Sequence, residues 1–241
     1  MTQTPAPIGD DLEVSIVIPI YNEARFLKDA VEAILAEMKM KRDRTFEVIL
    51  VENGSRDDTA AVAQSLAGEG KEVFRVLSLP RPDYGGALRA GFQAARGRFI
   101  VNFDLDYWNV EFACQALKVM KDQDLIIAAK NLPQSEDRRN VYRRFITWGF
   151  QNVLHLLFDY PYHDTHGIKV WRTSAVREIL PSVHFDRDLF DTEMILRGVK
   201  AGWRVQEVPI VVEEKRRPRM SIVPRIARTL LDLVALRRLV K

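Results

Sequence analysis

Short apolar runs separate longer segments of mixed polarity along the first 130 residues of the chain. The apolar runs occupy residues 14–19, 46–51, 73–77, 99–103 and 125–129. They are rich in valine, isoleucine, leucine and phenylalanine, which predicts buried strands. Between them apolar residues recur three or four positions apart, as over residues 24–40, which predicts helices with one buried face. Strands that alternate with helices favour an α/β fold, a mostly parallel sheet with right-handed crossovers and helices on both faces.

Polar residues mark the ends of these elements. Pro19 is expected to stop the first strand, because proline cannot donate a hydrogen bond to a ladder. Residues 52–55 are expected to form the loop after the second strand. Ser55, with Asp58 three residues later, is similar to a capping box and predicts a helix from there to about Leu66.

The remaining elements extend to the end of the chain. Helices are expected over residues 86–95, 110–120, 140–157, 191–201 and 224–239, and strands over residues 168–171 and 205–212. We expect residues 1–12 to be a flexible tail and residues 13–223 to form one domain. Its first half would run from residue 13 to about residue 130 and its second half from residue 131. Residues 224–239 combine an apolar stripe with arginines, which predicts a basic amphipathic C-terminal helix.

The composition is that of a chain with a packed core. Apolar residues make up 47% and charged residues 29% of the 241 residues. The single cysteine, Cys114, allows no disulfide within the chain and fits a reducing compartment. Residues 1–11 lack the basic and apolar regions of a signal peptide. No apolar run approaches the roughly 18 residues that cross a bilayer. We therefore expect a cytoplasmic protein.

The net charge of +3 is unevenly distributed. Residues 213–241 carry nine basic and three acidic side chains, a surplus of six, so the rest of the chain has a net charge of −3. A basic segment on a slightly acidic body favours a phosphate-rich partner such as a nucleotide or an anionic lipid. Nucleic acid is not expected, because the basic segment lacks interleaved aromatics. The C-terminal helix can either lie on the inner face of a membrane or pack on protein, and both remain open.

Two carboxylates, Asp104 and Asp106, stand where the fourth strand should end. In open α/β sheets ligands bind outside the carboxyl ends of the strands. Two carboxylates one residue apart can share a divalent cation, which prefers oxygen ligands. Such a cation can neutralise a diphosphate leaving group. The position of the pair therefore predicts a site for Mg²⁺ or Mn²⁺.

Several motifs, taken in order, resemble family 2 glycosyltransferases, which have the Rossmann-like GT-A fold. The motifs of the first half are VSIVIPIYNEA, VENGSRDDT, GGALRAGFQAARG and FDLD. In the second half, DTHGIKVWRTSA from Asp164 and FDTEMILRGVKAGWRVQEVPIVV from Phe190 are similar to polyprenyl- and dolichyl-phosphate mannose or glucose synthases. The Q-x-x-R-W motif of processive synthases is absent from the sequence. The resemblance implies inverting, metal-dependent transfer of one hexose from GDP-mannose or UDP-glucose to a polyprenyl phosphate.

The resemblance also implies a donor site at the ends of the first four strands. The nucleotide sugar would be bound by Pro19, Tyr21, Glu23, Glu52, Asn53, Gly86 and Asp104, with Arg217 and Arg219 in a basic loop that closes over the diphosphate. The metal would be held by Asp106, with Asp104 beside it. Glu52 and Asn53 stand where the family usually has two aspartates. Both can still accept a hydrogen bond from a base, and the choice of base remains open.

On the acceptor side, the resemblance implies a phosphate site made by Lys130, Arg143 and Thr147. Arg143 and Thr147 are four residues apart on a predicted helix and so face the same side. A phosphate monoester with a second pKa of about 6 is largely a dianion at neutral pH and needs no general base. Asp191 and Glu193 are then expected to hold the sugar or a basic neighbour, whereas a hydroxyl acceptor would require a general base nearby. Asp104, Asp106, Asp191 and Glu193 are thus the predicted catalytic residues.

Two alternatives remain. One is a family 2 transferase that acts on a hydroxyl group of a glycan or small metabolite. The other is a non-catalytic nucleotide-sugar-binding protein, against which the intact aspartate pair argues. The sequence leaves open which sugar is moved, the chain length of the lipid, and whether the chain forms a homo-oligomer.

Overall fold

The computed structural model describes residues 12–40, 44–69, 73–138, 141–212 and 223–240, without the side chains of residues 69, 137, 143 and 223–227. The strands are β1 (Val14–Ile20), β2 (Phe46–Asn53), β3 (Phe74–Leu79), β4 (Phe99–Asn102), β5 (Leu125–Ala129), β6 (Glu136–Asp137), β7 (Lys169–Arg172), β8 (Val205–Pro209) and β9 (Val211–Val212). The helices are α1 (Leu27–Met40), α2 (Thr59–Glu69), α3 (Tyr84–Ala94), α4 (Val110–Val119), α5 (Val141–Phe158), α6 (Thr173–Ile179), α7 (Phe190–Lys200) and α8 (Val223–Leu239).

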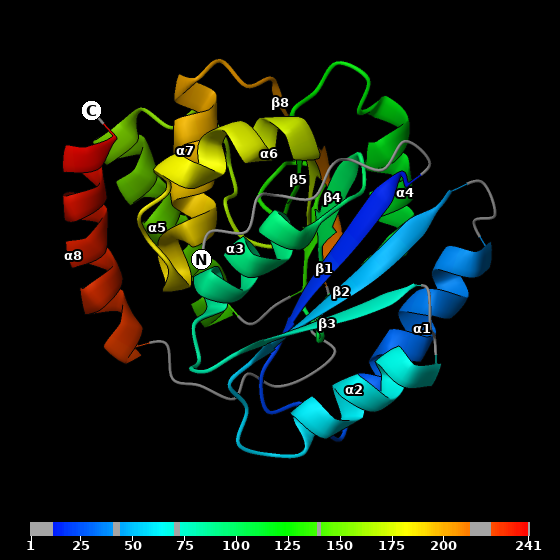
Figure 1. Cartoon of the computed structure of the whole chain (residues 1–241). Helices are drawn as coiled ribbons and strands as arrows, with labels where there is room; N and C mark the ends of the chain where they lie inside the picture. The colour runs from blue at the N-terminus through cyan, green and yellow to red at the C-terminus, as the bar shows by residue number, and fades with distance from the viewer. Residues whose placement is uncertain (1–11, 41–43, 70–72, 139–140, 213–222, 241) are drawn as a thin grey trace.

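Seven of the described strands form one sheet in the order β3-β2-β1-β4-β7-β5-β8 (Figure 1). All neighbouring strands are parallel except β7, which runs antiparallel to β4 and β5. The parallel strands therefore bring their carboxyl ends to one edge of the sheet, and the start of β7 lies at that same edge. The predicted α/β fold with a mostly parallel sheet and helices on both faces is confirmed.

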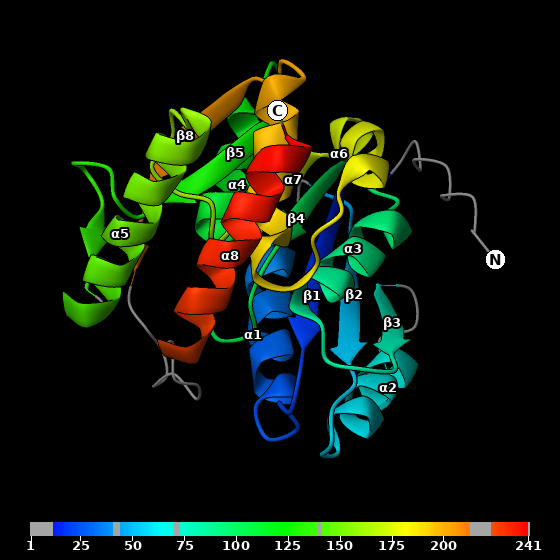
Figure 2. The same cartoon turned by 90° about the vertical axis from the view of Figure 1, so that its left-hand side faces the viewer.

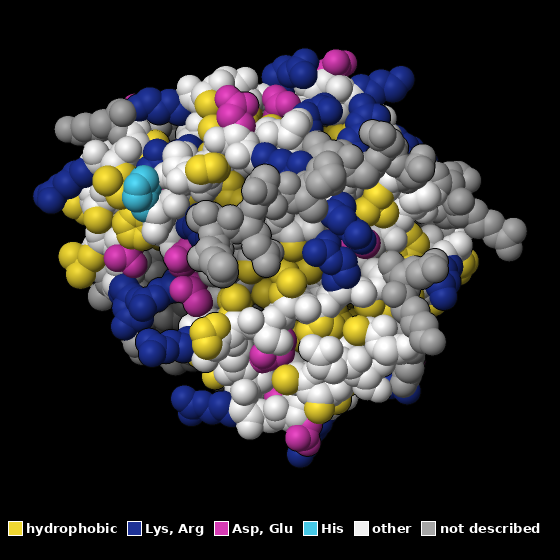
Figure 3. Space-filling model, viewed as in Figure 1, with side chains coloured by type: hydrophobic (Ala, Val, Ile, Leu, Met, Phe, Trp, Pro, Cys, Tyr) yellow, Lys and Arg dark blue, Asp and Glu magenta, His cyan; other side chains and the backbone are white. Residues whose placement is uncertain are grey.

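Helices cover both faces of the sheet because its strands are apolar on both sides. Alternate β1 residues Val14, Ile16, Ile18 and Ile20 pack in a core with α1, α2 and α4. Val17 of the same strand packs on the other face, with α3, α6 and α7. Helices α5 and α8 lie outside α7 on this second face (Figures 1 and 2). In the space-filling view, basic and acidic side chains are interspersed over the surface (Figure 3).

Pro19 does not stop the first strand, contrary to expectation. Strand β1 continues to Ile20 and pairs with β2 along its whole length, with Pro19 opposite Val51. On its other side β1 pairs with β4 only as far as Val17, whose carbonyl accepts the Phe103 N–H. Backbone groups of Val17 and Pro19 face the same side, because strand geometry repeats every two residues. The Pro19 nitrogen, which has no hydrogen to donate, therefore faces the side on which the pairing of β1 with β4 has already ended.

The predicted capping box at Ser55 is also wrong. Strand β2 extends through Asn53, and α2 begins only at Thr59. The Ser55 hydroxyl accepts the Asn22 N–H from the loop after β1 (3.0 Å), while Asp57 accepts the Thr59 N–H (3.1 Å). A tertiary contact thus uses the side chain that local pattern assigns to helix capping.

Two differences concern the second half. The single strand expected over residues 205–212 is two strands, since Ile210 leaves the ladder and its N–H donates to the Ser135 hydroxyl (3.2 Å). Helix α6 was not predicted.

Within the described residues, no helix is long and apolar enough to span a bilayer.

The C-terminal helix α8 packs on the domain. Leu233 and Leu236 are fully buried in the core that contains residues of α3 and α7. Leu230, Leu231 and Val234 remain exposed. Of the two interpretations left open for this helix, packing on protein holds for Leu233 and Leu236.

Candidate functional site

The loop after β1 is held against the start of α2, at the carboxyl edge of the sheet. Asn22 has a positive φ of 54°, and its side-chain oxygen accepts the Arg56 N–H (2.8 Å). The Glu23 N–H donates to the Thr59 hydroxyl (2.7 Å). These bonds fix the direction of residues 21–23, which the sequence assigns to donor binding. Tyr21 is exposed and Glu23 is half-buried, so both can meet a ligand.

Glu52 and Asn53 form the next segment of this edge. Both side chains are buried at the end of β2. Glu52 Oε1 accepts the Ser55 N–H (2.6 Å), and Asn53 Oδ1 accepts the Asp83 N–H (2.7 Å). Between them and Ser55 lies Gly54, with φ +66° and a backbone position where a Cβ would come within 2.9 Å of the Arg81 backbone. The loops after β2 and β3 are therefore tied together.

The glycine-rich start of α3 brings a third loop to the site. Asp83 caps the helix by accepting the Gly86 N–H (3.0 Å), and the same oxygen accepts the Arg187 N–H (2.9 Å). A Cβ on Gly85 would lie 2.5 Å from the Arg187 nitrogen. Only glycine therefore allows α3 to approach the segment that leads into α7.

The aspartate pair lies in a turn after β4. The Asp104 and Tyr107 backbones pair with each other, Asp104 is half-buried and Asp106 is exposed. The Tyr84 hydroxyl of α3 donates to Asp104 Oδ1 (2.9 Å). Burial raises the pKa of Asp104 to about 6, and the negative charges of Asp106 and Asp191 add to the effect. A cation bound beside Asp104 would therefore stabilise its ionised form.

A buried ion pair stands behind this turn. Lys169, the first residue of β7, donates to Asp191 Oδ2 (2.6 Å) and to the Gly167 carbonyl (2.9 Å). Both side chains are almost fully buried. Asp191 Oδ1 is buried too, and no described residue hydrogen-bonds to it. The sequence predicted Asp191 but missed Tyr84 and Lys169. A lysine inside the apolar run IKVW was the available signal, because unpaired lysine is almost never buried.

The two predicted acidic residues of α7 lie in different surroundings. Glu193 is fully buried and accepts the N–H groups of His184 (2.9 Å) and Phe185 (2.6 Å) and the Arg197 side chain (2.7 Å). Residues two apart on a helix do not face each other. Asp191 is close enough to Asp104 for its negative charge to raise the pKa of Asp104, whereas Glu193 anchors residues 184–185. A catalytic role for Glu193 remains an untested prediction.

Lys130 directly follows β5, and its side chain faces the loop before β7. Its Nζ lies 3.2 Å from Asp164 Oδ2 and donates to the His166 carbonyl (3.2 Å). Asp164 Oδ1 accepts the His166 N–H (2.9 Å). The His166 ring packs edge-on against Phe150 of α5, with ring centres 5.3 Å apart. Lys130 and Asp164 therefore hold together the loop that borders α5.

The other predicted phosphate ligands are only partly placed. Thr147 of α5 is half-buried, one helical turn before Gln151. Arg143 belongs to the first turn of α5, but its side chain lies outside the described residues. Arg217 and Arg219 of the predicted basic loop also lie outside the described residues.

The donor set suits a cation that is shared with a substrate. Asp104 and Asp106 supply oxygens, as Mg²⁺ and Mn²⁺ prefer, and the raised pKa of Asp104 shows that its negative charge is poorly compensated. No group of three or more possible protein ligands occurs in the part of the chain that the structure describes. Mg²⁺ typically uses one or two carboxylates and completes its coordination with phosphate and water. The pair fits that pattern.

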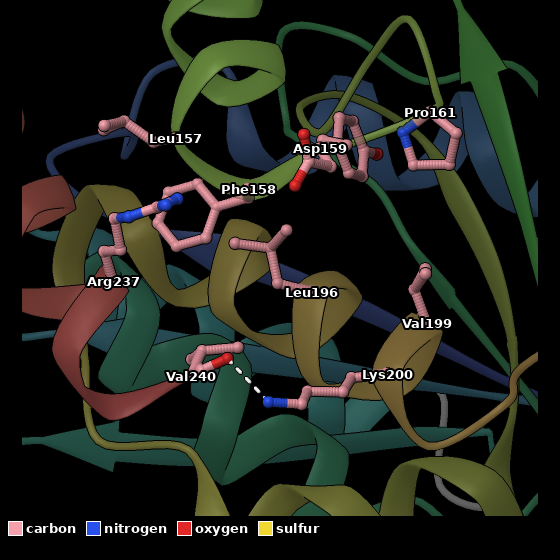
Figure 4. A pocket seen from close by; sticks show the side chains of 10 residues that line it. Leu157, Phe158, Asp159, Pro161, Leu196, Val199, Lys200, Arg237 and Val240 are labelled. Atoms are coloured by element: carbon pink, nitrogen blue, oxygen red, sulfur yellow. Dashed lines mark hydrogen bonds between the residues drawn. The ribbon is translucent and has the colours of Figure 1, made fainter.

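A separate cavity lies between α5, α7 and α8 (Figure 4). Its volume is about 370 Å³, and Leu157, Leu196 and Val240 contribute apolar walls. Lys200 Nζ, at its edge, donates to the Val240 carbonyl (3.0 Å). The cavity uses the C-terminal end of α7, whereas Asp191 belongs to the first turn of that helix. It is therefore distinct from the aspartate site.

Comparisons with known proteins agree with this geometry. The model of the family described as "Glycosyl transferase family 2" matches residues 15–182. The chain is 29% identical over 219 residues to glycosyltransferase AglD of Haloferax volcanii, covering 88% of this chain and 35% of that protein. It is 31% identical over 216 residues to dolichyl-phosphate beta-glucosyltransferase of Drosophila melanogaster, covering 83% and 66%. The chain thus spans about a third of the first relative and about two thirds of the second.

Solved structures show the same fold at low identity. Mannosyl-3-phosphoglycerate synthase from Rubrobacter xylanophilus superposes with a TM-score of 0.69 at 19% identity, covering 94% of this chain and 74% of that one. Glucosyl-3-phosphoglycerate synthase from Mycobacterium tuberculosis, in complex with Mn²⁺, uridine diphosphate and phosphoglyceric acid, gives 0.67 at 19% identity, covering 94% and 78%.

Proposed function

Because the chain belongs to glycosyl transferase family 2, we propose that it transfers one hexose from a nucleotide-diphosphate sugar to a polyprenyl phosphate at a membrane surface. The observation that carries the transferase proposal is the Asp104–Asp106 pair at the carboxyl end of β4, where a sheet of this type binds its ligand. The lipid-phosphate acceptor is supported by the relatives named dolichyl-phosphate beta-glucosyltransferase. Those names make glucose the first sugar to test, with mannose second.

The donor would lie along the loops after β1, β2, β3 and β4. Residues 19–23 and the buried pair Glu52 and Asn53 would surround the nucleoside, and Gly86 at the start of α3 would lie beside the diphosphate. The bonds between these loops fix their positions before the donor binds, which lowers the entropic cost of binding.

The divalent cation would be held by Asp106 and Asp104. When bound, it would neutralise charge that develops on the departing diphosphate. The Tyr84 hydroxyl, which donates to Asp104 Oδ1, would keep that carboxylate oriented. Asp191 Oδ1, buried and without a described partner, would accept a hydrogen bond from a hydroxyl of the donor sugar.

In the transfer step, a phosphate oxygen of the acceptor forms a bond to the anomeric carbon. The bond from that carbon to the diphosphate oxygen breaks, and the nucleoside diphosphate leaves with the electron pair. Attack from the opposite face inverts the configuration. The acceptor is already a dianion at neutral pH, so no proton has to be removed. Lys130, Thr147 and Arg143 would position it by charge and hydrogen bonding.

A donor panel tests the proposal. The full chain is incubated with undecaprenyl phosphate, Mn²⁺ and either UDP-glucose or GDP-mannose, and the lipid fraction is analysed for a sugar phospholipid. We expect product with one donor, none in excess chelator, and about two to three orders of magnitude less with Asp106→Ala. Absence of product with every donor would refute the proposal. Transfer to a glycan or small-molecule hydroxyl in its place would favour the hydroxyl-acceptor alternative.

A further inference from the structure

Helix α5 has two chemically different sides. Thr147 is half-buried, and Gln151 and Leu154 are buried on the side that faces the domain, with the Phe150 ring against His166. At 3.6 residues per turn, Phe145 falls almost opposite Thr147 and Leu154, and Val141 and Trp148 lie about 100–120° around the helix from Thr147. Val141, Phe145 and Trp148 are 74%, 65% and 61% exposed. The helix therefore has the predicted acceptor residues on one side and solvent on the other.

The exposed side is unusually apolar. Val141, Tyr142, Phe145 and Trp148, which we call the α5 aromatic face, occupy the first two turns of the helix, and the Phe145 and Trp148 rings stack with centres 5.7 Å apart. A group of exposed large apolar residues marks an interaction surface rather than ordinary surface. Tryptophan and tyrosine, in particular, are enriched where protein meets the head-group region of a bilayer.

We propose that the α5 aromatic face inserts into the interfacial region of an anionic lipid bilayer and so places the acceptor site at the membrane. This inference rests on the proposed polyprenyl-phosphate acceptor and names the surface that would meet it. Charge supports a lipid partner, because α5 contains Arg143 and Arg144 and no acidic residue over its 18 positions. Basic residues beside an inserted apolar face are attracted to anionic head groups.

The position of the face relative to the site supports the same partner. The Phe150 ring contacts His166, whose carbonyl accepts a hydrogen bond from Lys130. Residues 141–148 precede this contact along the helix and, in Figure 2, α5 lies at the outer edge of the domain. A lipid phosphate in a bilayer touching this edge would therefore lie near the predicted phosphate ligands, while its chain stays in the membrane.

Helix α8 offers a matched comparison. It also exposes apolar residues, with Leu231 73% exposed, but Asp232 is adjacent and the helix is bound to the core through Leu233 and Leu236. On that edge of the molecule apolar side chains are mixed with charged ones (Figure 3). A substitution at Leu231 thus removes an equally exposed side chain from a different surface.

Tryptophan fluorescence tests the insertion directly. Of the four tryptophans, Trp171 and Trp203 are buried, Trp108 is half-buried and Trp148 is exposed. The full chain is mixed with phosphatidylglycerol–phosphatidylcholine vesicles that carry bromine on their acyl chains and contain no acceptor lipid. We expect quenching that is lost in Trp148→Phe, while co-sedimentation of that variant with the vesicles falls less than about threefold.

A second variant measures the contribution of the face. Phe145→Ser/Trp148→Ser should lower vesicle partitioning by about a hundredfold, since removing each inserted aromatic costs roughly tenfold. Leu231→Ser should change it less than about threefold. Transfer to a short, soluble polyprenyl-phosphate analogue should persist in the double variant, which separates loss of docking from loss of the site. Circular dichroism of both variants checks that they are folded.

Each contrary result has a distinct meaning. No vesicle binding by the wild type, or quenching that survives in Trp148→Phe, would overturn the proposal. Equal loss with Leu231→Ser would assign docking to α8. Self-association that disappears in the double variant, without vesicle binding, would make the face an interface between two copies. Confirmed insertion with no sugar transfer to any polyprenyl phosphate would refute the proposed function and leave the docking surface standing.

Discussion

Glu47 and Asp191 are buried acids at opposite ends of the same sheet, and their surroundings differ in kind. Glu47 lies at the amino end, where Oε1 accepts the Ser15 hydroxyl (2.7 Å) and the Arg96 N–H (2.9 Å). Its other oxygen accepts the side chains of Arg75 (3.2 Å) and Arg96 (2.9 Å). Asp191 lies at the carboxyl end and has one oxygen on Lys169 and one without a described partner.

The pKa directions follow these contacts. Burial alone would raise the pKa of Glu47, but the hydrogen bonds from Ser15, Arg96 and Arg75 lower it below the ordinary value. At the other end burial, with Asp106 and Asp191 nearby, raises the pKa of Asp104 to about 6. Polar groups in a protein interior are normally satisfied. At the amino end, the carboxylate of Glu47 therefore has its hydrogen-bond partners within the protein. At the carboxyl end, carboxylate oxygens can still accept hydrogen bonds from a ligand or bind a cation.

The largest expected effect is on activity. Asp106→Ala should lower transfer by about two to three orders of magnitude, because a metal ion contributes several kcal/mol of charge stabilisation and each 1.36 kcal/mol is tenfold. Thermal unfolding should not change, since Asp106 is exposed and outside the core. Initial rates with saturating Mn²⁺ provide the measurement, with the exposed Asp58→Ala as the control. Full activity of the Asp106 variant would remove the pair from the mechanism.

The next effect is on stability at the same end. Lys169→Met should lower the free energy of unfolding by about 3 kcal/mol, because it leaves the Asp191 carboxylate buried without its cation. Adding Asp191→Leu should recover most of the loss, since a buried ion pair can be replaced by apolar groups. Urea unfolding of the two variants gives the numbers. Equal destabilisation of single and double variants would show that Lys169 acts by packing alone.

A substitution at the amino end of the sheet should lower the stability of the protein without changing the activity of the site. Glu47→Gln should cost about 2–3 kcal/mol, because an amide NH₂ replaces an acceptor among the arginine donors, which are partly exposed. The lowered pKa of Glu47 contributes stability above its ordinary value of 4.5 that is lost as pH falls through the folded-state value. The difference between wild type and variant in urea should therefore shrink below pH 4.5. Activity per folded molecule should stay unchanged, and its loss would contradict the separation of the two ends.

A smaller effect is expected on acceptor binding. Arg143→Ala should raise the KM for the lipid phosphate by roughly 10- to 150-fold, because a charged hydrogen bond is worth about 1.5–3 kcal/mol. The KM for the nucleotide sugar should change little. Arg144→Ala is the matched control when the acceptor is a short, soluble polyprenyl-phosphate analogue, since Arg144 is exposed and points about 100° away on the same helix. A loss that falls on the donor KM would end the acceptor assignment of Arg143.

Much of the fold was predictable because the hydrophobic periodicity of this chain is clear. The β5 bounds 125–129 are exact, and the strand end that carries Asp104 was placed within one residue. The errors occurred where tertiary contacts override local pattern. Ser55 bonds to Asn22 instead of capping a helix, and Pro19 stays in β1 because its neighbouring ladder is shorter.

The aspartates of the site could be predicted from the sequence, but the residues that hydrogen-bond to them could not. Asp104, Asp106 and Asp191 follow from the motifs, whereas Tyr84 and Lys169 reach them from α3 and β7, 20 and 22 residues away in sequence. No periodicity specifies which side chain lies beside a carboxylate across the sheet. The different fates of Asp191 and Glu193 likewise depend on the loop at residues 184–185, which approaches one and not the other.

The smallest predicted effect tests the comparison most directly. The pKa of Asp104 is near 3.8 in the unfolded chain and about 6 in the folded protein. Protonated Asp104 therefore stabilises the fold below pH 3.8, and this stabilisation is lost as the pH rises through about 6. The shift would correspond to about 3 kcal/mol for a fully buried carboxyl, and solvent reaching half-buried Asp104 reduces it to about 1 kcal/mol. In chelator, Asp104→Asn should therefore unfold about 2–4 °C above wild type at pH 7.5 and show no such gain at pH 4. Glu47→Gln should move the other way at pH 7.5. Mn²⁺ with the nucleoside diphosphate should close the gap at pH 7.5 by stabilising the wild type alone. If Asp104→Asn is destabilising at pH 7.5 in chelator, the protein stabilises the Asp104 carboxylate as well as it stabilises that of Glu47. The two ends of the sheet would then not differ in how far their buried acids lack partners.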